Sequence, residues 1–198
     1  MTVRKGARGE RGSQDCGTAT VGRVANGAWG LDIGHIFQGH ALNAVDAKGR
    51  VSVPASFRSL IEKRALANAL DPENALKIGE HKSGDCLWAL DAVASAEIDV
   101  QLAASLADLP AAERMDKLEE LAMETHGGLE KITYDSAGRM VLSPMLREFG
   151  QIEDLAFFVG AGLTFQIWNP RIAMERLPET SRVRKPLAFL LKERGIVL

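Results

Sequence analysis

Residues 46–54 read DAKGRVSVP, and residues 135–144 read DSAGRMVLSP. Both stretches follow the pattern Asp-x-x-Gly-Arg, in which Asp bonds backbone amides ahead of it and Gly adopts the positive φ that a tight turn favours. The residues that follow alternate between apolar and other types, which is the period of a β-strand. Each stretch therefore predicts a stiff turn that runs directly into a strand.

The alternation places one arginine of each copy on the outward side of its strand. Val51 and Val53 are expected on the inward face of the first strand, opposite Arg50. In the second copy Met140 is expected inward and Arg139 outward. A guanidinium held outside the core by a rigid turn is suited to binding an anion rather than to catalytic proton transfer.

The similarity between the two copies extends beyond the turns. Each copy continues into a Pro, at Pro54 and Pro144, followed by a short helical pattern, and Pro is favoured in the first turn of a helix. A later strand pattern also recurs, as GDCLWALD in residues 84–91 and GLTFQIWN in residues 162–169. Two copies are too few for a solenoid, so the repeat predicts two related halves of one barrel.

These paired turns, helices and Gly-led strands resemble the MraZ family over residues 36–177. The resemblance implies an α+β, mainly β, fold: a barrel of two pseudo-symmetric AbrB-like swapped-hairpin halves with helices between and after them. It divides the chain into an N-terminal extension (1–35), a first half (36–91), a helical spacer (92–127), a second half (128–177) and a C-terminal tail (178–198).

The resemblance also implies a function. It predicts a transcriptional regulator, a repressor, that acts as a ring-shaped homo-oligomer in the cytoplasm and on the nucleoid. Its partner would be double-stranded DNA, in tandem repeats upstream of its own gene and of the division and cell-wall gene cluster. The family's Gly-Arg position falls on Arg50 and Arg139. With supporting bases, the expected DNA-binding residues are Arg50, Arg139, Lys48, Arg58 and Arg147, and the expected turn-shaping residues are Asp46, Gly49, Asp135 and Gly138.

The three supporting bases, Lys48, Arg58 and Arg147, differ in the contribution to DNA binding expected of them. Lys48 lies in the first turn where the second copy has Ala137, so the two halves are expected to contribute unequally. Arg58 and Arg147 recur at the same offset from their turns. They are expected to support phosphate contacts, and the alternative is that they are exposed helix residues or partners of nearby acids.

Charge is segregated along the chain. The 198 residues have a formal net charge of −2, which excludes a uniformly basic DNA-coating protein. Residues 36–64 contain five bases and two acids, and residues 131–147 contain three bases and one acid. Residues 97–124 contain eight acids and two bases. The two repeats are thus basic and the spacer acidic, which would turn one face of the molecule toward phosphates.

The two ends depart from the family pattern, because related chains begin near the equivalent of Phe37. Residues 1–35 show no sustained apolar period and lack the features of a signal peptide, so we expect a solvated tail or an upstream start codon, with a loose DNA-binding arm as the alternative. The tail from Pro178 is rich in bases, and Phe189 favours a helix that docks on a neighbour over a phosphate-contacting arm.

The sequence gives little support to an enzyme. The four histidines are scattered along the chain, at His35, His40, His81 and His126. The two cysteines have neither the spacing of a metal site nor that of a disulfide framework. No cofactor or metal is therefore expected, and no run is long enough for a membrane span. The alternatives left open are a barrel enzyme or small-anion binder, and a ring-forming scaffold whose arginines serve only subunit contacts.

Overall fold

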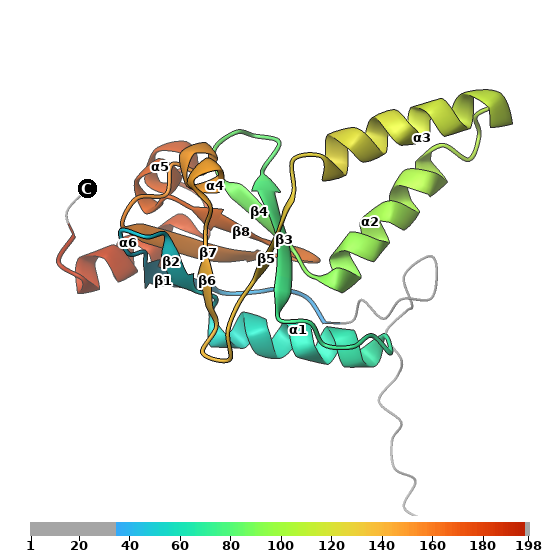
Figure 1. The fold of residues 1–198 in the computed structure, drawn as a ribbon. Coiled ribbons are helices and arrows are strands. Elements are labelled where there is room, and N and C mark those ends of the chain that lie inside the picture. The colour runs from blue at the N-terminus through green and yellow to red at the C-terminus, as the bar shows by residue number, and fades with distance from the viewer. Residues whose placement is uncertain (1–34, 197–198) are drawn as a thin grey trace, which may run out of the picture.

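A computed structural model describes residues 35–196 of the chain (Figure 1). All but the last residue of the predicted N-terminal extension therefore lies outside the described residues. The strands are β1 (His40–Ala44), β2 (Arg50–Ser52), β3 (Ala75–Glu80), β4 (Leu87–Leu90), β5 (Glu130–Thr133), β6 (Arg139–Val141), β7 (Leu155–Ala161) and β8 (Thr164–Trp168). The helices are α1 (Ala55–Ala67), α2 (Ala92–Ser105), α3 (Ala111–His126), α4 (Pro144–Phe149), α5 (Pro170–Arg176) and α6 (Arg184–Glu193).

The strands of the two sequence repeats are interleaved. The antiparallel six-stranded sheet has the order β1-β7-β8-β4-β3-β5, and β2 pairs with β6 in a separate ribbon. Thus β1 of the first repeat pairs with β7 of the second, while β5 of the second pairs with β3 of the first. The equivalent strands β4 and β8 pair with each other, as do β2 and β6. The six-stranded sheet thus contains strands of both repeats.

A closed barrel, which the sequence predicted, does not form within residues 35–196. The edge strands β1 and β5 of the six-stranded sheet are not paired with each other. They run into the two turns instead, and the three-residue strands β2 and β6 make their ladder hydrogen bonds to one another. The chain therefore has an open sheet covered by a short ribbon, an α+β fold in which the sheet dominates.

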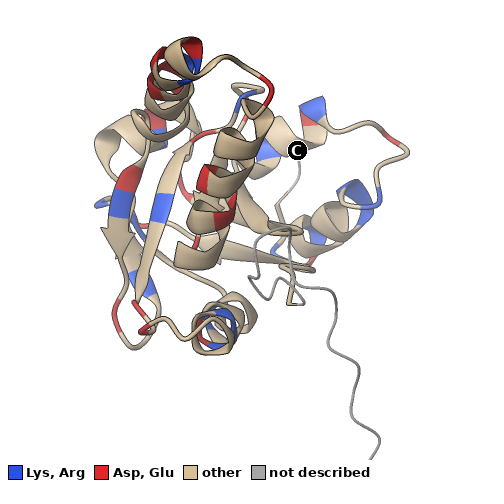
Figure 2. Ribbon diagram, turned by 90° about the vertical axis from the view of Figure 1, so that its right-hand side faces the viewer, with Lys and Arg blue, Asp and Glu red and all other residues tan. Residues whose placement is uncertain are grey.

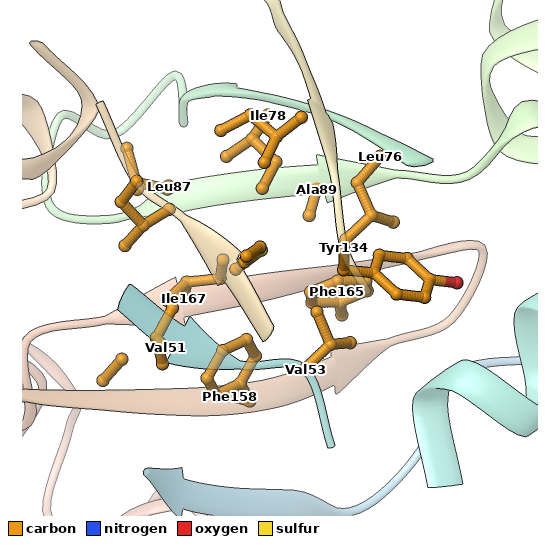
Figure 3. Packing of buried hydrophobic residues seen from close by; sticks show 14 of the residues in the cluster. Val51, Val53, Leu76, Ile78, Leu87, Ala89, Tyr134, Phe158, Phe165 and Ile167 are labelled. Carbon is orange, nitrogen blue, oxygen red and sulfur yellow. The ribbon is translucent and has the colours of Figure 1, made fainter. Parts of the chain in front are cut away.

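The main core lies between the ribbon and the sheet (Figure 3). Val51 of β2 and Met140 of β6 are 2% and 1% exposed, and they pack with Phe158, Phe165 and others from the sheet. The inward and outward faces of both repeat strands are thus as the alternation predicted. Since burial of apolar surface is the main favourable term in folding, this cluster fixes how the ribbon sits on the sheet.

A second apolar cluster covers the opposite side of the sheet with α5 and α6. Leu187 and Leu191 of α6 are buried among residues such as Leu42 and Phe157. Arg194 also donates a hydrogen bond to the Leu42 carbonyl. The apolar face of α6 covers the chain's own sheet, whereas Phe189, on which the expectation of docking on a neighbour rested, is 61% exposed.

The acidic spacer forms a helical pair that projects from the body of the molecule (Figure 1). Asp91 begins α2 as its N-cap, accepting a hydrogen bond from the Ala94 amide at 2.7 Å. No residue of α3 is buried, and His126 at its end contacts Asp99 of α2 at 2.6 Å. Figure 2 marks acidic residues in red along the ribbon of this pair.

A buried ion pair joins α1 to the start of α2. The guanidinium of Arg64 is 0% exposed, and its Nε lies 3.3 Å from Oδ2 of Asp91, which is 2% exposed. Arg64 also donates to the Leu163 carbonyl at 2.8 Å and lies over the ring of Phe37. Burial raises the pKa of Asp91 and lowers that of Arg64, while each charge opposes the shift of the other.

Candidate nucleic-acid interface

The first turn is organised by the Asp46 carboxylate. Its Oδ1 accepts hydrogen bonds from the backbone amides of Lys48 and Arg50, both at 2.9 Å. Gly49 lies between these residues with φ of +79°, where a side chain would be strained. Asp46 and Gly49 thus supply the local hydrogen bonds and the positive φ of this turn.

The second turn repeats this arrangement. Oδ1 of Asp135 accepts from the Ala137 amide at 3.0 Å and from the Arg139 amide at 2.9 Å. Gly138 has φ of +85°. The two turns are thus local copies of one structure.

Each turn aspartate also holds the arginine that begins the strand. Arg50 Nε lies 2.5 Å from Asp46 Oδ2, and Arg139 Nε lies 2.7 Å from Asp135 Oδ2. The arginine side chains remain 58% and 68% exposed. Each carboxylate engages Nε, which leaves the two terminal nitrogens of each guanidinium able to bond a phosphate or the edge of a guanine.

The hydrogen bonds also alter the acidity of the turn carboxylates. The Arg50 backbone amide, followed by the Arg50 side chain, lowers the pKa of Asp46 below its ordinary value. The Arg139 amide and side chain lower the pKa of Asp135 in the same way. Both turns are therefore held by ionised carboxylates at neutral pH.

Both arginines lie on one face of the β2–β6 ribbon. In the antiparallel register Arg50 is opposite Val141, and Ser52 is opposite Arg139, so these four side chains share the outward face. They line a shallow depression together with Asp46, Asp135 and neighbouring residues. Val141 is 52% exposed between the two arginines, an outward apolar position that the sequence reasoning left out.

Lys48, Arg58 and Arg147 differ in their surroundings. Lys48 is exposed on the first turn, beside Arg50. Arg58 and Arg147 are half-buried, and they donate to backbone carbonyls of the turns at Ser136 and Ala47. DNA binding by these three side chains stays a prediction. The local sequence gives no sign of the contacts of the two arginines, which join residues 78 and 100 positions apart.

Ser143, which follows β6, has a structural role. Ser143 caps α4 by accepting from the Leu146 amide at 3.2 Å, and it donates to Glu130. No group of three or more metal-ligating side chains occurs in the described part of the chain. Cys86 is buried, which raises the pKa of its thiol to about 12 and leaves it unreactive. Within residues 35–196, no helix is both long and apolar enough to cross a membrane.

Comparison with known proteins gives the chain its class. No family model matches the sequence. A curated protein of Ruegeria pomeroyi is 37% identical over 138 residues, or 68% of this chain and 77% of its own length. Relatives from Gluconobacter oxydans and Parvibaculum lavamentivorans are 36% and 34% identical, covering 71% and 80% of this chain and 80% and 96% of their own lengths. All three are named as transcriptional regulators, not as enzymes, in agreement with the expectation of a non-enzymatic protein.

These relatives all carry the name MraZ. The chain belongs to the MraZ family of transcriptional regulators.

Proposed function

We propose that this protein is a sequence-specific DNA-binding regulator that grips duplex DNA with the outward face of the β2–β6 ribbon. The observation that carries the proposal is the placement of Arg50 and Arg139, both exposed and both held by a turn aspartate on the same face. A two-stranded ribbon fits the major groove, where guanidiniums can read guanine and span phosphates.

The charge distribution supports this orientation. The arginine-bearing ribbon lies on the body of the fold, whereas the acidic α2–α3 pair projects away from that body (Figures 1 and 2). A duplex on the ribbon would therefore approach the positive part of the protein. We assign the main contacts to Arg50 and Arg139, with Lys48 adding to the first turn.

The working unit we propose is a homo-oligomer, in the form of a ring. One chain presents few cations on its ribbon, and useful affinity at cellular salt requires several phosphates to be neutralised. The α3 helix, which has no buried residue and exposes Met115 and Met123 to 68% and 64%, is a surface suited to contacts between chains. Repeated ribbons would match tandem DNA repeats.

The target and outcome that we propose follow the family resemblance. They are repression of the protein's own promoter and of the division and cell-wall gene cluster, by a cytoplasmic, nucleoid-associated protein. The two halves of the fold would then be AbrB-like swapped hairpins, a reading that the exchange of strand partners between the repeats supports.

A gel-shift series on the protein's own upstream DNA tests the proposal. We expect a specific shift that weakens steeply with salt, because phosphate contacts release counterions. Absence of a shift at low salt, with the protein folded, would favour a small-anion binder or a scaffold. Footprinting on the same DNA would locate the repeats.

A further inference from the structure

The helix arginines reach across from one repeat to the turn of the other. Arg58 lies on α1, after the first turn, yet its Nη1 donates to the Ser136 carbonyl of the second turn at 3.0 Å. Arg147 lies on α4, after the second turn, and its Nη1 is 3.4 Å from the Ala47 carbonyl of the first. Equivalent residues thus make equivalent contacts in opposite directions.

The turn glycines are shaped to receive these side chains. A Cβ added to Gly138 would lie 2.5 Å from Arg58 Nε and 2.7 Å from its Cδ. A Cβ added to Gly49 would lie 3.1 Å from Arg147 Cδ and 2.6 Å from the Leu142 carbonyl oxygen. The glycine of each turn therefore has two roles. It adopts a positive φ, and its lack of a side chain leaves room for the arginine from the other repeat.

Backbone hydrogen bonds cross in the same sense. The Val53 amide donates to the Gly138 carbonyl at 2.8 Å, and the Leu142 amide donates to the Gly49 carbonyl at 2.9 Å. Arg147 is further fixed by the carbonyls of Ile152 and Glu153, at 3.3 and 3.4 Å. Each turn is consequently supported by the strand end and the helix of the other repeat.

We propose that Arg58 and Arg147 are positioning residues, each of which holds the turn of the opposite repeat. Their Nη1 donors contact backbone carbonyls within the turns, whereas Arg50 and Arg139 lie exposed on the outward face of the ribbon. The consequence for DNA binding rests on the function proposed above. It is that loss of Arg58 impairs the work of Arg139, and loss of Arg147 impairs that of Arg50.

The crossed pattern can be tested without DNA. In NMR spectra of the full chain, Arg58→Met is expected to shift the amide signals of residues 135–139 and to leave those of residues 46–50 near their original positions. Arg147→Met should do the reverse. Lys63→Met, which removes a charge from an exposed position of the same helix as Arg58, is the control and should move neither turn. Shifts confined to the turn that precedes each arginine in sequence would overturn the proposal.

A double-mutant cycle on upstream DNA then tests the functional consequence. Arg58→Met should weaken binding about tenfold, the loss expected when a hydrogen bond from a charged group is removed. In an Arg139→Ala background Arg58→Met should weaken binding less than twofold, because the turn that Arg58 supports no longer carries the Arg139 contact to DNA. In an Arg50→Ala background the full loss should return.

The outcomes of the two experiments are separable. If the NMR shifts cross as expected but the unmodified protein does not bind DNA, the proposed function fails and the support of the turns stands. If the protein binds DNA and the effect of Arg58→Met is equally large in both arginine backgrounds, Arg58 acts as an independent phosphate contact and the positioning role is wrong. If Arg58→Met fails to fold, Arg147→Met provides the same test at the first turn, which carries Arg50.

Discussion

Asp46 Oδ2 lies 2.5 Å from Arg50 Nε, in a turn whose amides are bonded by the same carboxylate. The aspartate thus orients the arginine while placing a negative charge beside the proposed DNA surface. These two effects predict opposite results when the carboxylate is neutralised. Orientation should dominate, because a guanidinium fixed before binding loses less freedom when it meets its target.

We therefore predict that Asp46→Asn weakens binding to upstream DNA, although it removes a negative charge. The expected loss is about tenfold, as for a charge-assisted hydrogen bond. Fluorescence anisotropy with labelled DNA measures it. Asp85→Asn, which breaks an ion pair with Arg176, removes the same charge elsewhere and serves as the control. Tighter binding by Asp46→Asn would show that the carboxylate merely repels DNA.

The acid sensitivity of the turns follows from the lowered pKa values of Asp46 and Asp135. A group whose pKa is depressed by folding stabilises the folded state above its ordinary pKa and loses that contribution as the pH falls through the depressed value. The midpoint of the change in the turn amide shifts should therefore lie below pH 3.8, the ordinary pKa of an aspartate. A midpoint above 3.8 would contradict the hydrogen bonding described for the turns.

The glycine of the second turn is expected to tolerate substitution worse than another glycine of similar backbone. Gly138 and Gly162 have φ of +85° and +81°, but only at Gly138 would a Cβ meet other atoms, those of Arg58. Both alanine variants should lose about 1–2 kcal/mol for the left-handed backbone. Gly138→Ala should lose more in urea unfolding, because Arg58 must also move. Equal losses would mean that the arginine does not press on the turn.

The buried pair of Arg64 and Asp91 gives a stability prediction independent of DNA. Arg64→Met should lower the free energy of unfolding by about 3–5 kcal/mol, because it leaves a buried carboxylate without its partner. Adding Asp91→Ser, which removes the carboxylate and keeps a helix-capping hydroxyl, should recover part of this loss. Denaturant unfolding of the two variants measures both effects. A double variant no more stable than Arg64→Met would show that the pair is not coupled.

The sequence predicts the local parts of this structure well. Asp46, Gly49 and Arg50 form their turn through contacts within five residues, and α4 begins at Pro144, in the first-turn position expected of it. Such contacts are specified by short patterns, which is why the turns, the strand faces and the helix starts follow from residue spacing.

The rest depends on contacts between distant segments. Closure of the sheet into a barrel depends on whether the edge strands β1 and β5 pair with each other. The sequence of one repeat alone does not determine this pairing. Arg58 and Arg147 lie at the same offset from their own turns, which is why the sequence suggested phosphate contacts there. Contacts between the two repeats direct each side chain to the opposite turn instead. The docking of α6 is likewise fixed by Leu187 meeting the sheet's second face.

The double variant Arg50→Ala/Arg139→Ala tests the central claim most directly. Binding to upstream DNA is measured by anisotropy across a salt series, after circular dichroism and light scattering have shown an unchanged fold and oligomer size. We predict a large loss of affinity and a shallower dependence on salt, because both outward guanidiniums are gone. Unchanged affinity with an unchanged salt dependence would contradict the account.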